Sequence, residues 1–223
     1  MYAANTWISH DQSSSAQHWV KGETAQILTA IYTRAINLVQ FERSMDKAVS
    51  HYCQTLLTAA PRLNLRLALS AEHPARALCK VLPAHAERDA FAADLGQLIE
   101  MYTCLFELDE VGLRLQVIDR AMCPRFHVDR LGCRLVSTYR GAATQWLDND
   151  DVDRSKLGRG SLRVGDEHSG IYQSDCHIVQ AREGDVLLLK GEGWPGNQGL
   201  GAVRRSPPMV SGERRLIATL DFA

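Results

Sequence analysis

His127 and Asp129 stand two residues apart in the segment CPRFHVD, and their types and spacing suit a metal ion. Alternate residues of a β-strand point to the same face, so a strand here would let both side chains reach one ion. An imidazole and a carboxylate are two of the three protein ligands in many non-haem Fe(II) sites. The same two residues also occur together as an ordinary surface pair, and the HxD pattern alone leaves both interpretations open.

Two later segments place arginines after an apolar stretch. The sequence GDVLLLK, from Gly184 to Lys190, is typical of a turn followed by a buried strand. A second segment, VRRSPPMVSGERR, begins at Val203. It contains two adjacent pairs of arginines: Arg204, Arg205, Arg214 and Arg215. Guanidinium groups suit a small carboxylate or phosphate, but strand alternation turns one member of each pair toward solvent.

The order of these motifs, HxD, then the apolar strand, then P-x-x-x-G-x-R, resembles the Fe(II)/2-oxoglutarate-dependent dioxygenases. The resemblance implies a double-stranded β-helix, a cupin-like jelly roll with a metal in its mouth. It further implies that His127 and Asp129 hold Fe(II). Arg214 then matches the arginine that clamps the far carboxylate of 2-oxoglutarate, because a planar guanidinium can bind a carboxylate through two hydrogen bonds. The resemblance also leads us to expect Tyr139 next to 2-oxoglutarate.

The chain is more closely similar to an uncharacterised bacterial family defined by a domain of unknown function. The shared motifs are CPRFHVD, TxWL at Thr144–Leu147, KGEGWPGN at Lys190–Asn197, RSPP and GERR, and the similarity is strongest over residues 111–221. Within KGEGWPGN, Trp194 fits both a packed turn at the end of the barrel and a place in the cavity mouth. The family typically has HRSP where this chain has RRSP. It implies a fold but no established activity.

Arg204 is the one departure from the dioxygenase pattern. The third metal ligand of that pattern is a His ten residues before the clamping arginine, and counting back from Arg214 gives Arg204. A guanidinium stays protonated and offers no lone pair, so Arg204 cannot be the third ligand. One interpretation is that His177, or Cys176 beside it, supplies a replacement. The others are water completing a two-ligand site, or loss of iron with Arg204 in the cavity, paired with Asp129 or with an anion.

The cysteines allow a different metal. Cys123, His127 and Cys133, together with His177 or Cys176, have the donor types of a tetrahedral zinc site. Their spacing matches no common zinc module, and each cysteine also fits the interpretation of an apolar core residue. Zinc is therefore the alternative to Fe(II) and 2-oxoglutarate.

The elements that must position these residues differ between the two halves of the chain. Residues 1–110 are predicted to be mainly helical, with helices over 44–59 and 86–108 and a strand over 63–69. Residues 111–223 are predicted to be the jelly roll, and the whole chain to be one folding unit of α+β class. The strands predicted in the second half cover 113–119, 126–129, 133–139, 174–180, 185–190 and 216–222.

Composition excludes several classes of partner. The 223 residues include 25 Lys and Arg and 26 Asp and Glu, for a formal charge of −1, so no basic excess points to nucleic acid or anionic lipid. No apolar run approaches the length of a membrane span and no secretory signal is evident, so we expect a cytoplasmic protein. The leading hypothesis is a metal-dependent, oxygenase-like protein acting on an unidentified small molecule or protein. The alternative is a non-catalytic, degenerate oxygenase or a zinc-handling protein that uses the same cavity.

Overall fold

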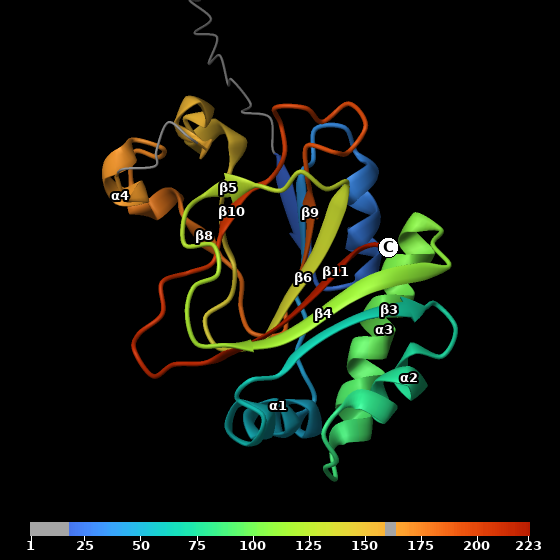
Figure 1. The fold of residues 1–223 in the computed structure, drawn as a ribbon. Coiled ribbons are helices and arrows are strands. Elements are labelled where there is room, and N and C mark those ends of the chain that lie inside the picture. The colour runs from blue at the N-terminus through green and yellow to red at the C-terminus, as the bar shows by residue number, and fades with distance from the viewer. Residues whose placement is uncertain (1–17, 159–163) are drawn as a thin grey trace, which may run out of the picture.

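Two β-sheets face each other in the computed structural model, which describes residues 18–158 and 164–223 (Figure 1). The larger sheet has seven strands in the order β1-β2-β9-β6-β11-β4-β3, and the smaller has four in the order β5-β10-β7-β8. β1 pairs with β2 in parallel, and the other described pairs are antiparallel. The strands are β1 (Trp19–Gly22), β2 (Leu38–Phe41), β3 (Asn64–Ser70), β4 (Glu110–Ile118), β5 (His127–Val128), β6 (Cys133–Arg140), β7 (Gln145–Leu147), β8 (Val179–Gln180), β9 (Val186–Lys190), β10 (Val203–Arg205) and β11 (Arg215–Phe222).

Helices cover the face of the large sheet that is turned away from the small one (Figure 1). The longest, α3, buries Phe91, Leu95 and Tyr102 on one side, as the apolar spacing predicts. Helix α1 begins after Asp46, whose carboxylate accepts a hydrogen bond from the backbone N of Ala48 at 2.7 Å. The α-helices are α1 (Lys47–Ala59), α2 (Pro74–Val81), α3 (Arg88–Phe106) and α4 (Asp166–Ser169), and 3₁₀ turns cover Ala25–Tyr32, Asn149–Asp151, Arg154–Lys156 and Asp175–His177.

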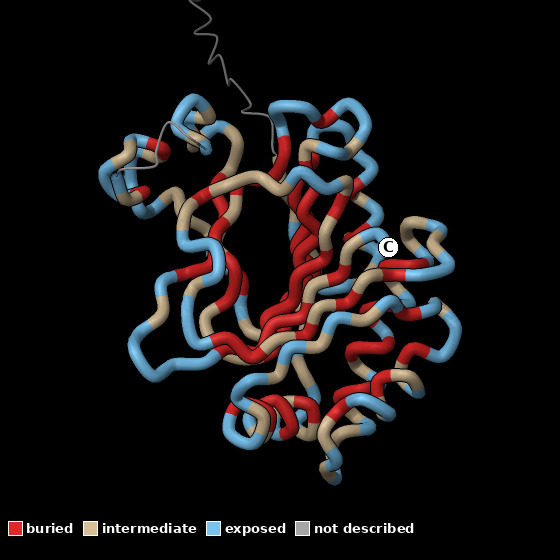
Figure 2. Tube along the Cα trace, in the orientation of Figure 1, coloured by how far each residue is buried: buried red, intermediate tan, exposed pale blue. Residues whose placement is uncertain are grey.

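The large sheet has a buried core on each face, as the burial pattern along the chain shows (Figure 2). On β11, Leu216 and Ala218 belong to the core on the helix side, whereas Ile217 belongs to the core between the sheets. The small sheet contributes Trp146 to this second core. Strand alternation therefore decides which side chains point into the space between the sheets, which we call the barrel interior.

The α+β class is confirmed, but the first half of the chain is less helical than predicted. It contributes β1, β2 and β3 to the large sheet, and the expected boundary at residue 110 falls at the first residue of β4. β4 pairs with β3 on one side and with β11 on the other, so both halves share one sheet. Helix α2 is not among the predicted elements; it begins with Pro74, and proline is well tolerated in the first turn of a helix. Among the described residues, no helix has the length and apolar character needed to span a bilayer.

The strand expected over 174–180 is shorter in the structure. Its first part is a 3₁₀ turn over Asp175–His177, and only Val179–Gln180 form β8. The Ser174 side chain accepts a hydrogen bond from the backbone N of Cys176, which favours a turn over an extended strand.

Candidate active site in the barrel mouth

The backbone around His127 and Asp129 is fixed by the KGEGWPGN segment. The carbonyl oxygen of Asp129 accepts a hydrogen bond from the backbone N of Glu192 at 2.9 Å, and that of Leu131 accepts one from the N of Gly193 at 3.0 Å. A Cβ at Gly191 would lie 2.1 Å from the carbonyl oxygen of Leu131, so only glycine permits this close approach. The segment thus positions His127 and Asp129, the two residues that the sequence predicts to be metal ligands.

His127 and Asp129 lie side by side at the mouth of the barrel interior, with 3.9 Å between His127 Nε2 and Asp129 Oδ1. His127 Nδ1 lies 2.9 Å from the carbonyl oxygen of Arg125, which requires the proton on Nδ1 and leaves the lone pair on Nε2. Burial, followed by the charge of Arg204, lowers the pKa of His127 below its usual value. The imidazole is therefore neutral at pH 7 and oriented as a ligand would be.

Asp129 is held by two arginines. Arg204 donates from Nη2 to both carboxylate oxygens, at 2.8 and 3.0 Å, and from Nε to Oδ2 at 3.2 Å. Arg134 adds a hydrogen bond from Nη1 to Oδ1 at 3.1 Å. Burial alone would raise the pKa of Asp129, but the two guanidinium groups outweigh it and lower that pKa. The carboxylate is ionised, and both of its oxygens accept hydrogen bonds from arginine side chains.

These residues do not fit a three-ligand iron centre. Arg204 is the Cα partner of His127 across β10 and β5. Where the dioxygenase pattern has its third metal ligand, this chain therefore has a cation, and that cation is paired with Asp129, the second predicted ligand. His177 does not replace it. His177 lies just before β8, and β8 is the edge strand of the small sheet opposite to β5. Its Nδ1 lies 3.2 Å from Asp151 Oδ1.

The zinc ligands suggested by the sequence are not brought together. Cys133 is fully buried in the core on the helix side of the large sheet, away from His127. Cys123 and Cys176 are exposed. Burial also raises the pKa of the Cys133 thiol well above its usual range, which disfavours the thiolate that zinc requires.

Arg215, and not Arg214, points into the barrel. Arg214 is exposed and donates from Nη1 to the backbone oxygen of Leu57 at 3.1 Å. Arg215 is 1 % exposed and pairs across the strands with Ile118 of the core between the sheets. Its Nη2 lies 3.4 Å from Thr138 Oγ1, while Nε and Nη1 are buried without a hydrogen-bond partner in the described parts of the chain. Burial lowers its pKa from 12.5 to about 10, so it remains a cation at pH 7.

Tyr139 and Trp194 lie outside the barrel interior. The Tyr139 hydroxyl donates to Asp94 of helix α3 at 2.7 Å, because the side chain points to the helix side of β6. Trp194 also packs on the helix side, where its ring centroid is 5.0 Å from Lys190 Nζ and 5.6 Å from the ring of Tyr32. The tryptophan of KGEGWPGN thus covers a buried lysine and does not contribute to the mouth.

A family model described as a protein of unknown function, DUF1826, matches residues 22–221. The chain belongs to the DUF1826 family. No curated protein matches it. Solved structures show the fold: the dioxygenase for auxin oxidation of rice is 13 % identical, with a TM-score of 0.54 over 92 % of this chain and 82 % of that one. The corresponding enzyme of Arabidopsis thaliana, solved with 2-oxoglutarate, is 10 % identical, with a TM-score of 0.51 over 92 % of this chain and 91 % of that one.

This DUF1826 chain carries a further group of possible metal donors. Nδ1 of His18 lies 2.9 Å from Asp148 Oδ1 and 3.9 Å from Asp150 Oδ1. The three residues are at the start of β1 and just after β7, and no spacing in the sequence brings them together. Two carboxylates and one imidazole suit a divalent cation, but Nδ1 of His18 is already hydrogen-bonded to Asp148.

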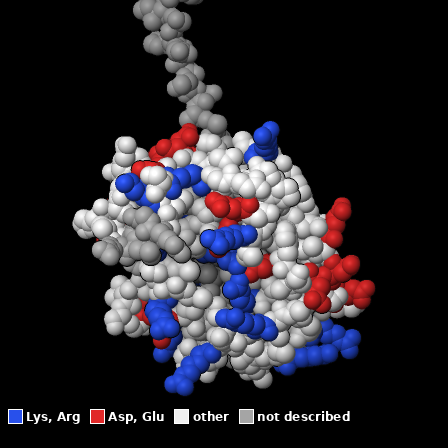
Figure 3. Space-filling model, turned by 45° about the horizontal axis from the view of Figure 1, so that its top comes forward, with Lys and Arg blue, Asp and Glu red and all other residues white. Residues whose placement is uncertain are grey.

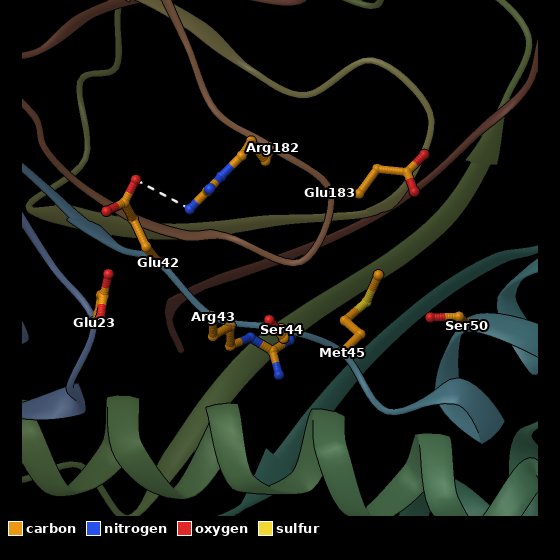
Figure 4. A pocket seen from close by; sticks show the side chains of 8 residues that line it. All are labelled: Glu23, Glu42, Arg43, Ser44, Met45, Ser50, Arg182 and Glu183. Carbon is orange, nitrogen blue, oxygen red and sulfur yellow. Dashed lines mark hydrogen bonds and ion pairs between the residues drawn. The ribbon is translucent and has the colours of Figure 1, made fainter.

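A hollow with a volume of about 720 Å³ lies elsewhere on the DUF1826 chain, between the end of β2 and the turn before β9 (Figure 4). Most of its charged groups already have partners. Arg182 donates to Glu42 at 3.1 Å, and Arg43 binds both oxygens of Asp94 at 2.6 and 3.0 Å. None of the site residues predicted from the sequence lines this hollow.

Counting motif positions selects Arg214, whereas the inward-facing arginine of the pair is Arg215. The signal that could have found it is strand alternation, which allows only one member of the pair Arg214–Arg215 to face inward. The apolar residues at 216, 218 and 220 already mark the helix-side face of β11, and Arg215 belongs to the other face.

Proposed function

We propose that this protein binds a small 2-oxo acid or dicarboxylate in the barrel interior, with Arg215 as its anchor, and that it does so without a metal ion. The observation that carries the proposal is the buried guanidinium of Arg215, two of whose nitrogens have no acceptor among the described residues. A buried cation without a counter-charge is costly, and a carboxylate supplies both the charge and the hydrogen-bond acceptors.

The surroundings of Arg215 favour an acid with an apolar middle part. Its neighbours on the inward face are Ile118, Ile217 and Thr138, and its Cγ packs where a Cβ of Gly141 would stand, at 2.7 Å. A short aliphatic acid can place one carboxylate on Arg215 and its methylene groups on the isoleucines. The Arabidopsis dioxygenase of the same fold was solved with 2-oxoglutarate, which supports the choice of this acid as the probe.

The ion pair between Arg204 and Asp129 is the reason why we propose that the acid binds without a metal ion. A metal ion would have to displace a guanidinium that makes three hydrogen bonds to the carboxylate and would then meet a cation at its third position. The loss of these hydrogen bonds and the repulsion between the ion and the guanidinium both oppose metal binding.

A second candidate is an Fe(II)- and 2-oxoglutarate-dependent oxygenase. The orientation of His127 favours it, since the hydrogen bond from Nδ1 to the Arg125 carbonyl leaves Nε2 directed toward Asp129, as in a metal ligand pair. His127 and Asp129 would then hold the ion, and Arg204 would have to leave Asp129.

Calorimetric titration of the protein with 2-oxoglutarate and with succinate, in excess EDTA, tests the proposal. We expect binding that is lost in Arg215→Met and retained in Arg214→Ala, the matched control one residue away. Binding unchanged by Arg215→Met, or absent from the unmodified protein, would overturn the proposal. A parallel anaerobic titration with Fe(II) addresses the second candidate, which requires 2-oxoglutarate to bind more tightly when iron is present and no longer to do so in His127→Ala.

A further inference from the structure

A row of arginines runs along the inward face of the large sheet and ends on β10 of the small sheet. Basic side chains gather in a column down the middle of this side of the molecule, with acidic ones beside them (Figure 3). We call this row the arginine ladder. It consists of Arg66 on β3, Arg114 on β4, Arg134 on β6 and Arg204 on β10.

Two carboxylates hold most of the ladder together. Arg114 and Arg134 both bind Asp221 of β11, and Arg134 donates to it from Nε at 2.6 Å and from Nη2 at 2.9 Å. Arg134 also reaches Asp129, which it shares with Arg204. Three guanidinium groups therefore share two carboxylates, and with Arg66 the ladder has an excess of two positive charges.

Arg66, at the open end of the ladder, accounts for one of these two charges. It is exposed and has no ion pair or side-chain hydrogen bond within residues 18–158 and 164–223. Arg66 and Arg114 are directly opposite each other in the β3–β4 register, on the same face. Like charges at opposed positions of a sheet destabilise it, so an anionic group between the two would relieve the repulsion.

The sheet leaves room for such a group. A hollow of about 330 Å³ is lined by Arg66, Arg114 and Asp221 together with the small residues Ala68 and Gly112. Even a Cβ at Gly112 would come no closer than 3.6 Å to its nearest neighbour. The hollow is open to solvent and is positively charged on two sides.

β3 is the edge strand of the large sheet, and no described strand pairs with its free side. An extended peptide can pair with such an edge through its backbone while alternate side chains reach the face of the sheet. A peptide paired in this way runs along β3, so its side chains on this face reach Arg66 first and then Arg114 on the next strand, β4.

We propose that the arginine ladder is a docking surface for an acidic, extended segment of a partner protein, whose carboxylates bind Arg66 and Arg114. Asp221 and Asp129 interrupt the row of positive charge, which suits separately spaced carboxylates better than the continuous charge of a nucleic acid. This proposal does not depend on the ligand of Arg215, because the ladder residues used here lie on β3 and β4.

Fluorescence anisotropy with a labelled peptide of about eight residues, in which Glu alternates with Thr, tests this docking surface. We expect the peptide to bind at low salt, to weaken as salt rises, and to bind better than the matched Gln–Thr peptide. Arg66→Ser should weaken binding about threefold to fivefold, whereas Arg62→Ser, an exposed arginine just before β3, should leave it unchanged.

Arg66→Glu provides a second variant whose folding is not at risk. The new carboxylate would face Arg114 across the strands, so thermal stability should be kept or raised while peptide binding is lost. Equal binding of the Glu and Gln peptides would overturn the proposal. So would unchanged binding in both Arg66 variants, or tighter binding of a single-stranded oligonucleotide than of the acidic peptide.

Discussion

Replacing Arg215 by methionine should make the protein more stable while abolishing its binding of small carboxylates. The guanidinium is 1 % exposed, and burial lowers its pKa from 12.5 to about 10. At about 1.4 kcal/mol per pKa unit, the charged form destabilises the folded state by about 3 kcal/mol. The penalty applies to the protonated guanidinium, so it is fully present at all pH values well below 10, including pH 7.

Methionine has similar length and no charge, so the variant should recover most of this penalty, and a gain of about 1–4 kcal/mol is the usual range for such replacements. For a chain of this size, the melting temperature should rise by roughly 5–10 °C. The measurements are urea unfolding and thermal unfolding of the wild type and of Arg215→Met, each with and without 2-oxoglutarate.

The ligand should stabilise the wild type and have no effect on the variant. A variant that is less stable than the wild type and is still stabilised by 2-oxoglutarate would refute the reasoning, because Arg215 would then be a structural residue. Arg214→Ala, an exposed change at the neighbouring position, should alter neither quantity by more than about 0.5 kcal/mol.

Three further outcomes follow from the barrel mouth. Arg204→His should create Fe(II) or Zn(II) binding that the wild type lacks, measured by metal titration, and equal affinity in both proteins would contradict the placement of residue 204. The pKa of Asp129 is lowered in the folded state, so the stability that its ion pairs provide is present near neutral pH and is lost as pH falls below about 4; urea unfolding of Asp129→Asn between pH 7 and 3 should show a weaker pH dependence than that of the wild type. Gly191→Ala should destabilise the fold by about 3 kcal/mol or more, because its Cβ would overlap the carbonyl oxygen of Leu131; Gly112→Ala, with its nearest neighbour at 3.6 Å, should be tolerated, and similar melting temperatures would count against this account.

Local spacing predicted the elements best where one face of an element is buried. The apolar stripe of α3 and the alternation in β3 and β4 are regular enough to be found in the sequence, with ends that differ by a few residues from the structure. β1, β7 and β10 have only three or four residues each, too few to establish a period, and the pairing that creates them comes from distant parts of the chain.

The three residues at the centre of the candidate site could be predicted from the sequence, whereas the residues that surround them on neighbouring strands could not. His127 and Asp129 share a face because they are two residues apart, and motif order placed Arg204 beside them. Whether a residue on a neighbouring strand faces inward depends on register and bulges, which motif spacing does not reveal. Tyr139 is left without a partner between the pairs Leu216–Arg140 and Ile217–Thr138 of β11 and β6. Its side chain lies on the helix side of β6 together with those of Cys133 and Leu135, as strand alternation from Cys133 requires.

The ion pair between Arg204 and Asp129 also changes how the barrel mouth responds to its surroundings. A site held together by a metal ion loses its order when the ion is chelated, exchanged or oxidised. A guanidinium that is part of the polypeptide can be neither chelated nor exchanged, and its charge is constant over the physiological pH range. The mouth of this barrel should therefore keep the same arrangement of charges whether metals are scarce or plentiful, and whether oxygen is present or not.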